Sequence, residues 1–294
     1  MTEINFRPTD YLELSRQAGV LIDNAASGDY ESCVRLLTEL MGDQFPALIR
    51  DSNPVYLGSA DWRAAVLRFV IQEYSGFSNA AIHMFLEARI RNHWSELTAE
   101  IVRNMDEEMG ALTRGIPHLE LMRHGYRVEL GVETEGLSYT ALTRDFIDRM
   151  SCLFRNPDNV FLAGVLLAFE TTAVDEFRVV DRLLRRYKAL SGGDISPRSL
   201  TGEYIAVHVL SESTDEDNDP EMDHRRGMIR AIGAHMNGQD LRALTRGFLA
   251  VCLELNRWWE QIGLEALQQE IRESLAHDSH TWPDPYKRLL QPAA

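Results

Sequence analysis

The stretch Ala99–His118, AEIVRNMDEEMGALTRGIPH, joins an acidic helix end to a glycine-rich turn and then to a histidine. The last turn of a helix usually favours lysine or arginine, because the backbone carbonyls there carry partial negative charge. Here Asp106, Glu107 and Glu108 occupy that turn instead. A solvated acidic turn would explain them in an acidic chain, and so would a metal ion held together with distant partners. The rest of the sequence has to decide between these interpretations.

Glu107 and His118 can share an ion only if the helix breaks between them. On one continuous helix they would face the same side but lie ~16 Å apart, at about 1.5 Å per residue. Gly110, Gly115 and Pro117 supply a helix stop, a flexible turn and a residue suited to a helix start. We therefore predict that His118 opens a second helix, folded back near Glu107.

The composition excludes several classes of protein. A net charge of −15 and a pI near 5.0 leave no basic footprint for nucleic acid or an anionic membrane surface. The cysteines are three in number and have no CxxC spacing, which disfavours a disulfide framework and a thiolate zinc site and fits a reducing compartment. The polar start MTEINFRPTD has no secretion signal, and the longest apolar run, residues 160–169, is too short for a membrane span. We expect a cytoplasmic protein.

Helical periodicity dominates the chain. Apolar residues recur at three and four positions, and no segment has the sustained alternation typical of strands, so we predict an all-α fold. Residues 11–26 and 30–41 form a predicted helical hairpin, separated by Ser27-Gly28-Asp29. We expect residues 1–55 to be an amino-terminal helical extension and residues 56–294 to form the main domain.

Later helices carry further candidates for a metal site. Glu170 falls on the apolar stripe of a long helix predicted for residues 159–190, where a charge costs several kcal/mol unless it is paired or bound to a metal. A buried salt bridge explains Glu170 as well as a metal ion does. His208 belongs to a short helix, and Glu221 and His224 share one face of the helix that follows the acidic segment SESTDEDNDP.

These candidates suit iron. Imidazole and carboxylate ligands without thiolate favour iron or manganese over structural zinc, and carboxylates can bridge two ions. A ferritin-like site needs two Glu-x-x-His pairs, whereas this chain has one such pair in the set, so that fold is the weaker candidate. The predicted metal ligands are Glu107, His118, Glu170, His208, Glu221 and His224.

The order of these motifs resembles the haem-oxygenase-like diiron oxidases and oxygenases over roughly residues 60 to 235. That family has a DE-x-x-G helix end, a histidine, a glutamate in an apolar helix, and a final His-x-x-x-Asp-x-x-His helix. The resemblance implies a haem-oxygenase-like helical bundle with two Fe(II) ions as cofactors and O2 as co-substrate. The matching positions are Asp106-Glu107 with Gly110, His118, Phe169-Glu170, and the region from His208 to His224.

The chain departs from this pattern in its last motif. The acidic segment SESTDEDNDP is inserted within the motif, between His208 and His224. The central carboxylate is therefore either Glu212, one turn after His208, or Glu221, which keeps the x-x-His spacing. We favour Glu221.

The first motif contains a conflict. Leu97, Ile101 and Met105 direct the apolar face of the helix towards Glu108, whereas the family's spacing from the glycine selects Glu107. We follow the family and predict Glu107. Glu73, on an earlier helix, is open as a further ligand.

We therefore expect a non-haem diiron enzyme that activates O2 to oxidise a small-molecule substrate. The resemblance implies either N-oxygenation of an amine or amino-acid-derived metabolite, or oxidative C–C cleavage or desaturation of a fatty or amino acid. The long spacing from Glu107 to His118 is more similar to the N-oxygenating relatives, which favours the first. A non-enzymatic helical interaction protein and a metal-free cofactor-binding protein are the rival classes. An external electron donor and a homodimer are left open.

Overall fold

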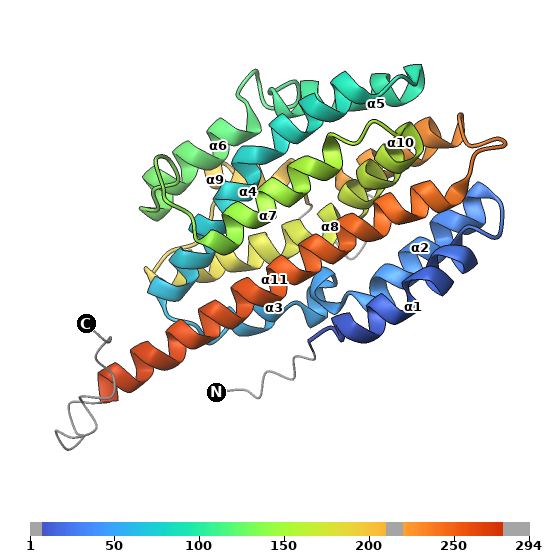
Figure 1. Cartoon of the computed structure of the whole chain (residues 1–294). Helices are drawn as coiled ribbons and strands as arrows, with labels where there is room; N and C mark the ends of the chain where they lie inside the picture. The colour runs from blue at the N-terminus through green and yellow to red at the C-terminus, as the bar shows by residue number, and fades with distance from the viewer. Residues whose placement is uncertain (1–7, 210–219, 279–294) are drawn as a thin grey trace.

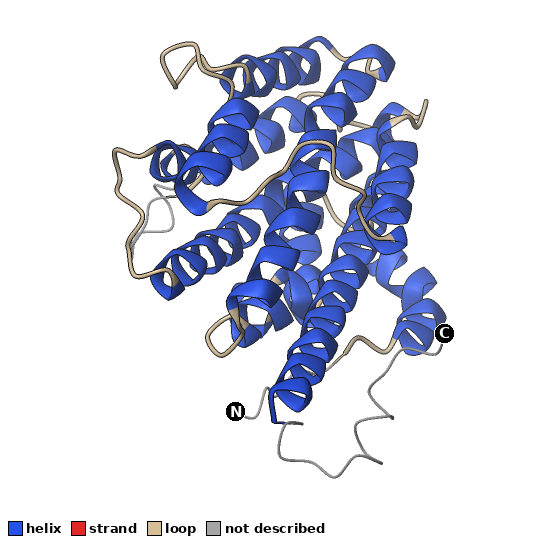
Figure 2. Ribbon diagram, turned by 90° about the vertical axis from the view of Figure 1, so that its left-hand side faces the viewer, coloured by secondary structure: helices blue, strands red, loops and turns tan. Residues whose placement is uncertain are grey.

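The computed structural model describes residues 8–209 and 220–278, and within these ranges every regular element is helical (Figures 1 and 2). The prediction of an all-α bundle is confirmed. The long helices are α4, α8 and α11, and the shorter ones surround them. The elements are α1 (Tyr11–Ala25), α2 (Tyr30–Gln44), η1 (Pro46–Leu48), η2 (Arg50–Ser52), α3 (Pro54–Gly58), α4 (Ala64–Arg91), α5 (Ser95–Glu108), α6 (His118–Gly125), η3 (Tyr126–Leu130), α7 (Ala141–Phe154), α8 (Asn159–Leu190), α9 (Leu200–Ala206), α10 (Pro220–Gly233) and α11 (Leu241–Asp278).

The centre of the bundle is the packing of α8 against α11, the most extensive contact between two elements. Two glycines bring the backbones together there. A Cβ added to Gly164 would lie 2.0 Å from the carbonyl oxygen of Leu244, and one added to Gly247 would lie 2.0 Å from that of Phe161. Only a residue without a side chain fits at these positions, so the crossing of the two helices depends on both glycines.

Gly164→Ala is expected to lower the free energy of unfolding by about 1–3 kcal/mol, because the added methyl group has to push α11 away. The matched control is Gly19→Ala in α1, where no atom lies within 4 Å of the new Cβ. There the better helix propensity of alanine should raise stability by up to about 1 kcal/mol. Urea unfolding of both variants measures the difference, and equal changes would contradict the close packing of α8 and α11.

The predicted amino-terminal hairpin is present as α1 and α2, which lie along α11 in Figure 1. Side chains of α2, among them Cys33 and Leu37, belong to the same hydrophobic core as Trp258 and Trp259 of α11. The domain boundary near residue 55 stays a prediction. Buried residues on both sides of it belong to one hydrophobic core.

The predicted break between α5 and α6 is also present. The helix ends at Glu108, Gly110 and Gly115 adopt left-handed conformations with φ of +103° and +83°, and α6 begins at His118. A side chain at Gly110 would lie 2.7 Å from the backbone of Gly115 and Ile116, so the turn closes only around glycine. Together, α5 and α6 lie on the side of the bundle away from the α1–α2 hairpin (Figure 1).

None of the helices in the described ranges is long and apolar enough to cross a membrane.

Candidate metal centre

The turn after α5 places three possible ligands together, which we call the first cluster: Glu108, His118 and His208. Glu108 Oε1 lies 3.3 Å from His118 Nδ1 and 3.7 Å from His208 Nε2. The second distance is too long for a hydrogen bond. Donor atoms bound about 2.0–2.2 Å from one ion lie about 3.0–3.5 Å from one another, so the 3.3 Å separation matches this range and the 3.7 Å separation is slightly longer. A small movement of the side chains would bring all three to a single metal ion.

His208 is oriented by the end of α9. This helix stops at Ala206. Just beyond it, the backbone N–H of His208 donates to the Ile205 carbonyl, and the Tyr204 carbonyl accepts from the His208 ring instead. The Nδ1–carbonyl distance is 2.8 Å, which assigns the proton to Nδ1 and leaves the Nε2 lone pair facing Glu108. The Phe177 ring stacks on the imidazole with a centroid distance of 3.7 Å. Such a fixed neutral imidazole is the form that binds a metal.

The electrostatics of the first cluster are those of an ionised carboxylate between imidazoles. Burial opposes ionisation of Glu108, but the contact with His118 at 3.3 Å and the nearby imidazole of His208 outweigh it and hold the pKa of Glu108 below its ordinary value. Burial lowers the pKa of His208, with Glu108 opposing the shift. The His118 Nε2 atom is buried and has no hydrogen-bond partner in the described ranges, so this ring has an unused nitrogen.

The second cluster consists of Glu170, Glu221 and His224. His224 Nδ1 lies 3.7 Å from Glu170 Oε2 and 3.7 Å from Glu221 Oε2. Both carboxylates are buried, and Asn104 Nδ2 donates to Glu170 Oε1 at 2.7 Å. Two buried carboxylates beside one imidazole leave negative charge that a divalent cation would compensate.

The pKa values of the second cluster report this crowding of charge. Burial raises the pKa of Glu170 to about 7 and that of Glu221 well above its ordinary value, although His224 opposes both shifts. Burial alone would lower the pKa of His224, but Glu221 and Glu170 raise it to about 9. Without a metal ion, the cluster therefore holds protons more tightly than isolated side chains do.

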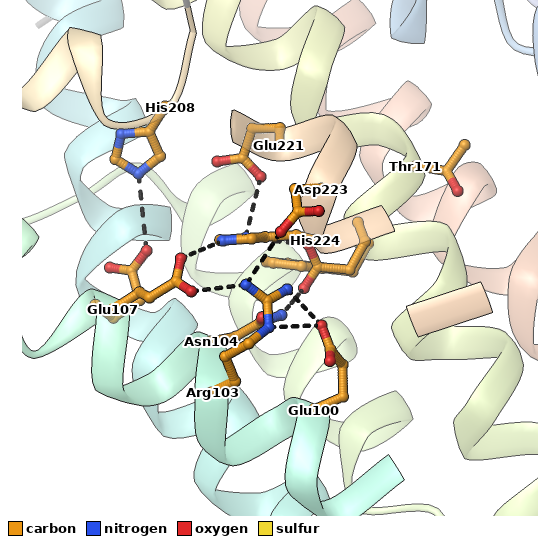
Figure 3. A network of polar contacts seen from close by, with 12 residues as sticks. Glu100, Arg103, Asn104, Glu107, Thr171, His208, Glu221, Asp223 and His224 are labelled. Carbon is orange, nitrogen blue, oxygen red and sulfur yellow. Dashed lines mark hydrogen bonds and ion pairs between the residues drawn. The ribbon is translucent and has the colours of Figure 1, made fainter. Parts of the chain in front are cut away.

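Glu107 lies behind this second cluster. Its Oε2 atom is 2.7 Å from His224 Nε2, and its Oε1 atom accepts from Arg103 Nη1 at 2.6 Å (Figure 3). Arg103 also binds Glu100 and lies 3.5 Å from Asp223. A carboxylate on the far nitrogen of a histidine fixes the orientation of that ring for a metal on the near nitrogen. The geometry therefore places Glu107 as a support for His224, and Glu108 as the carboxylate of the first cluster.

This arrangement differs from our choice of Glu107 as ligand. Leu97, Ile101, Asn104 and Glu108 are spaced at three and four residues, so they form one stripe on the inner face of α5. Glu107 is rotated by about 100° from that stripe. The other predicted residues, His118, Glu170, His208, Glu221 and His224, all belong to one of the two clusters.

Two further carboxylates were left open by the sequence. Glu73 is in neither cluster: both of its oxygens accept from Thr140, the residue that caps α7, at 2.7–3.2 Å. Glu212 lies outside the described residues.

Both clusters line one cavity of about 270 Å³. Its other walls are aromatic and aliphatic, with Phe77, Phe85, Phe169 and Phe177 among them. The described residues that line it include five glutamates and no lysine or arginine. The cavity therefore combines an acidic interior with apolar walls.

The donor set fits a pair of oxygen-preferring or imidazole-preferring transition metals. One cluster offers two imidazoles and a carboxylate, and the other offers one imidazole and two carboxylates. None of the three cysteines is in either cluster. Such thiolate-free sets suit iron or manganese. The fold and this pair of clusters define an all-helical protein with a candidate two-metal centre.

Comparison with known proteins places the chain in a family. Residues 31–265 match the family described as "Domain of Unknown Function with solved-structure structure (DUF3865)", and the chain belongs to it. No curated protein matches the sequence.

Two crystal structures of a CADD-like protein of unknown function from Nostoc punctiforme PCC 73102 share the fold. One covers 81% of this chain and 98% of its own, with a TM-score of 0.70, and the other covers 82% and 97%, with a TM-score of 0.69. Both are 22% identical in sequence to this chain. The predicted class of helical bundle is thereby supported by solved structures.

Proposed function

We propose that this protein is a non-haem diiron enzyme that activates O2 and oxidises a small amine. The observation that carries this proposal is the pair of clusters that line one cavity, each with imidazole and carboxylate donors. Together they contain five of the six residues that the resemblance to the haem-oxygenase-like diiron enzymes selects. Glu108, His118 and His208 would hold one iron, and Glu170, Glu221 and His224 the other. Two ferrous ions bound there would supply electrons for the reduction of O2.

The chain's own residues position these ligands and keep water out. The Tyr204 carbonyl and Glu107 fix the rings of His208 and His224 through the nitrogens that face away from the carboxylates of each cluster. The phenylalanines that surround the ligands lower the local dielectric constant, which strengthens electrostatic interactions within the cavity.

The charge of the cavity favours an amine over a fatty acid. No lysine or arginine is found among the described lining residues, so apart from the metal ions the cavity offers no cation to a carboxylate substrate. An ammonium group instead meets carboxylates. This complementarity supports N-oxygenation of an amine over oxidation of a fatty acid.

Iron binding tests the proposal directly. We expect protein loaded with Fe(II) under anaerobic conditions and then desalted to retain about two irons per chain, since each cluster has three donors. His118→Ala should lower the content to about one. His83→Ala is the matched control, because His83 is exposed on α4 and belongs to neither cluster.

Elemental analysis measures these contents, and an oxygen electrode measures whether the loaded protein consumes O2. Retention of zinc in preference to iron, or no retained metal, would count against the diiron proposal. Two irons without O2 consumption in the presence of amines would favour a role in metal storage.

A further inference from the structure

Glu176 is a buried carboxylate of the cavity that neither cluster uses. It lies on α8, one and a half turns beyond Glu170, and its side chain lines the cavity together with Phe77 and Phe177. The residue is partly accessible although it lies in the interior, so its accessible surface faces the cavity.

The groups around Glu176 are hydrogen-bond donors without charge. The Tyr74 hydroxyl donates to Glu176 Oε1 at 3.0 Å, and the indole of Trp259 lies near this side chain and lowers its pKa. Tyr74 and Trp259 are themselves held face to face, with ring centroids 5.9 Å apart. The Tyr74 hydroxyl, held in place by this ring contact, therefore orients the carboxylate.

Glu176 has no cation to offset its charge. Burial raises its pKa to about 7, Tyr74 and Trp259 oppose the shift, and no lysine, arginine or histidine of the described residues contributes to it. Glu107 is paired with Arg103 and His224, and Glu254 with Arg149 at 2.6 Å, whereas within the described ranges the buried Glu73 and Glu260 accept from uncharged donors only. Glu176 differs from Glu73 and Glu260 because it lines the cavity, where a ligand can reach it. An isolated buried carboxylate is unfavourable unless a ligand supplies the missing charge.

We propose that Glu176 binds the ammonium group of the substrate and that the substrate is an amine with an apolar chain and no carboxylate. The Tyr74 hydroxyl holds the carboxylate, which accepts from the ammonium. Phe77, Ile82 and Phe85 enclose the hydrocarbon part. The described lining has no lysine or arginine to pair with a substrate carboxylate at this subsite.

Binding at Glu176 restricts which atom of the substrate can be oxidised. This inference rests on the proposed function. Six residues of helix separate Glu176 from Glu170, which is about 9 Å along the axis of α8. An ammonium group anchored at Glu176 therefore lies away from Glu170 of the second cluster, and an atom oxidised at that cluster belongs to the other end of the molecule. For N-oxygenation, that end is a second nitrogen, so the substrate class is a diamine with an apolar spacer.

Calorimetric titration with n-hexylamine tests the subsite, with 1-hexanol and hexanoate as comparison ligands of the same chain length. The full chain is used both free of metal and loaded anaerobically with Fe(II). We expect the wild type to bind hexylamine more tightly than hexanol or hexanoate in both forms. Glu176→Gln, which keeps the size and the Tyr74 contact, should weaken hexylamine binding by about 10- to 100-fold and leave hexanol binding unchanged.

Glu120→Gln is the control for a general loss of negative charge. Glu120 also lines the cavity, but it is exposed and paired with Arg123 at 3.2 Å, so hexylamine binding should stay within about twofold of the wild type. Equal affinity of the wild type for hexylamine and hexanol, or equal loss in the two variants, would overturn the subsite.

The iron content of the same preparations separates this proposal from the proposed function. Glu176→Gln with two irons and weak hexylamine binding supports both. If the wild type binds two irons but does not prefer hexylamine, the subsite proposal is wrong and the diiron proposal stands. If the protein binds hexylamine selectively but retains no iron, the subsite proposal stands and the diiron proposal is wrong. A helical circular dichroism spectrum like that of the wild type establishes that each variant is folded.

Discussion

Glu108→Ala is expected to lower the iron content from about two to about one per chain, whereas Glu107→Ala retains both irons at saturating Fe(II). Glu108 is the only carboxylate of the first cluster, so its loss leaves two imidazoles without an anionic ligand. Glu107 supports His224 through the distant ring nitrogen and contacts neither His118 nor His208 in the described structure. Its loss should weaken the second cluster about 10- to 100-fold without abolishing it.

The measurement is an anaerobic Fe(II) titration of the two variants beside the wild type. The number of irons bound per chain tests the role of Glu108. The Fe(II) concentration at half-saturation tests the role of Glu107. Glu203→Ala serves as the control, because this glutamate is paired with Arg114 and belongs to neither cluster. The reverse ranking, with one iron lost in Glu107→Ala and none in Glu108→Ala, would return the ligand role to the residue that the family spacing selects.

The break in the helix was predictable because its causes are local. Glycine is required where φ is positive, and proline suits the start of a helix, so Gly110, Gly115 and Pro117 together predict a turn wherever they occur in this spacing. Glu170 was predictable for a similar reason. A carboxylate on the buried stripe of a long helix has to face the core, and it is 2% exposed.

The choice between Glu107 and Glu108 shows which sequence signal is stronger. Neighbouring residues on a helix point about 100° apart, so only one of the two can face the cavity. The stripe of Leu97 and Ile101 selects Glu108, and the structure follows the stripe rather than the motif spacing. Asn104 lies on the same stripe, and the same periodicity would have identified it as a buried partner of the site.

Glu176 could not be identified from the sequence, because its role depends on contacts between distant helices. Tyr74 comes from α4 and Trp259 from α11, and only the packed bundle brings both to α8. Nothing in the local pattern separates Glu176 from Asp175, the carboxylate next to it. The orientation of His208 depends in the same way on where α9 ends, which periodicity does not determine to within one turn.

Glu170→Gln is expected to remove the iron of the second cluster and to stabilise the iron-free protein at high pH. Glutamine keeps an oxygen to accept from Asn104, but it is a poor ligand for iron because it has no charge. In the iron-free wild type, burial raises the pKa of Glu170 from 4.5 to about 7. The folded state therefore binds the proton more tightly than the unfolded state, and this contribution to stability is complete below pH 4.5 and is lost as the pH rises through 7.

The stability of Glu170→Gln does not depend on this proton, because glutamine does not titrate. Its advantage over the wild type should therefore be small at pH 5 and reach about 1–3 kcal/mol at pH 8. The charged neighbours limit the gain. Glu221 on α10 and Glu100 and Glu108 on α5 add to the repulsion that the substitution relieves, whereas His224 loses a carboxylate that raises its own pKa.

Urea unfolding of the iron-free proteins at pH 5 and pH 8 measures the effect, and iron analysis of the loaded proteins measures the ligand role. Glu120→Gln is the control, since an exposed glutamate paired with Arg123 should change neither quantity. A variant that retains two irons and is less stable by about 3–5 kcal/mol at both pH values would show that Glu170 forms a structural ion pair with His224. Loss of one iron together with a gain in stability confined to high pH is the result that a metal ligand predicts, because only the metal ion then offsets the charge buried at this position.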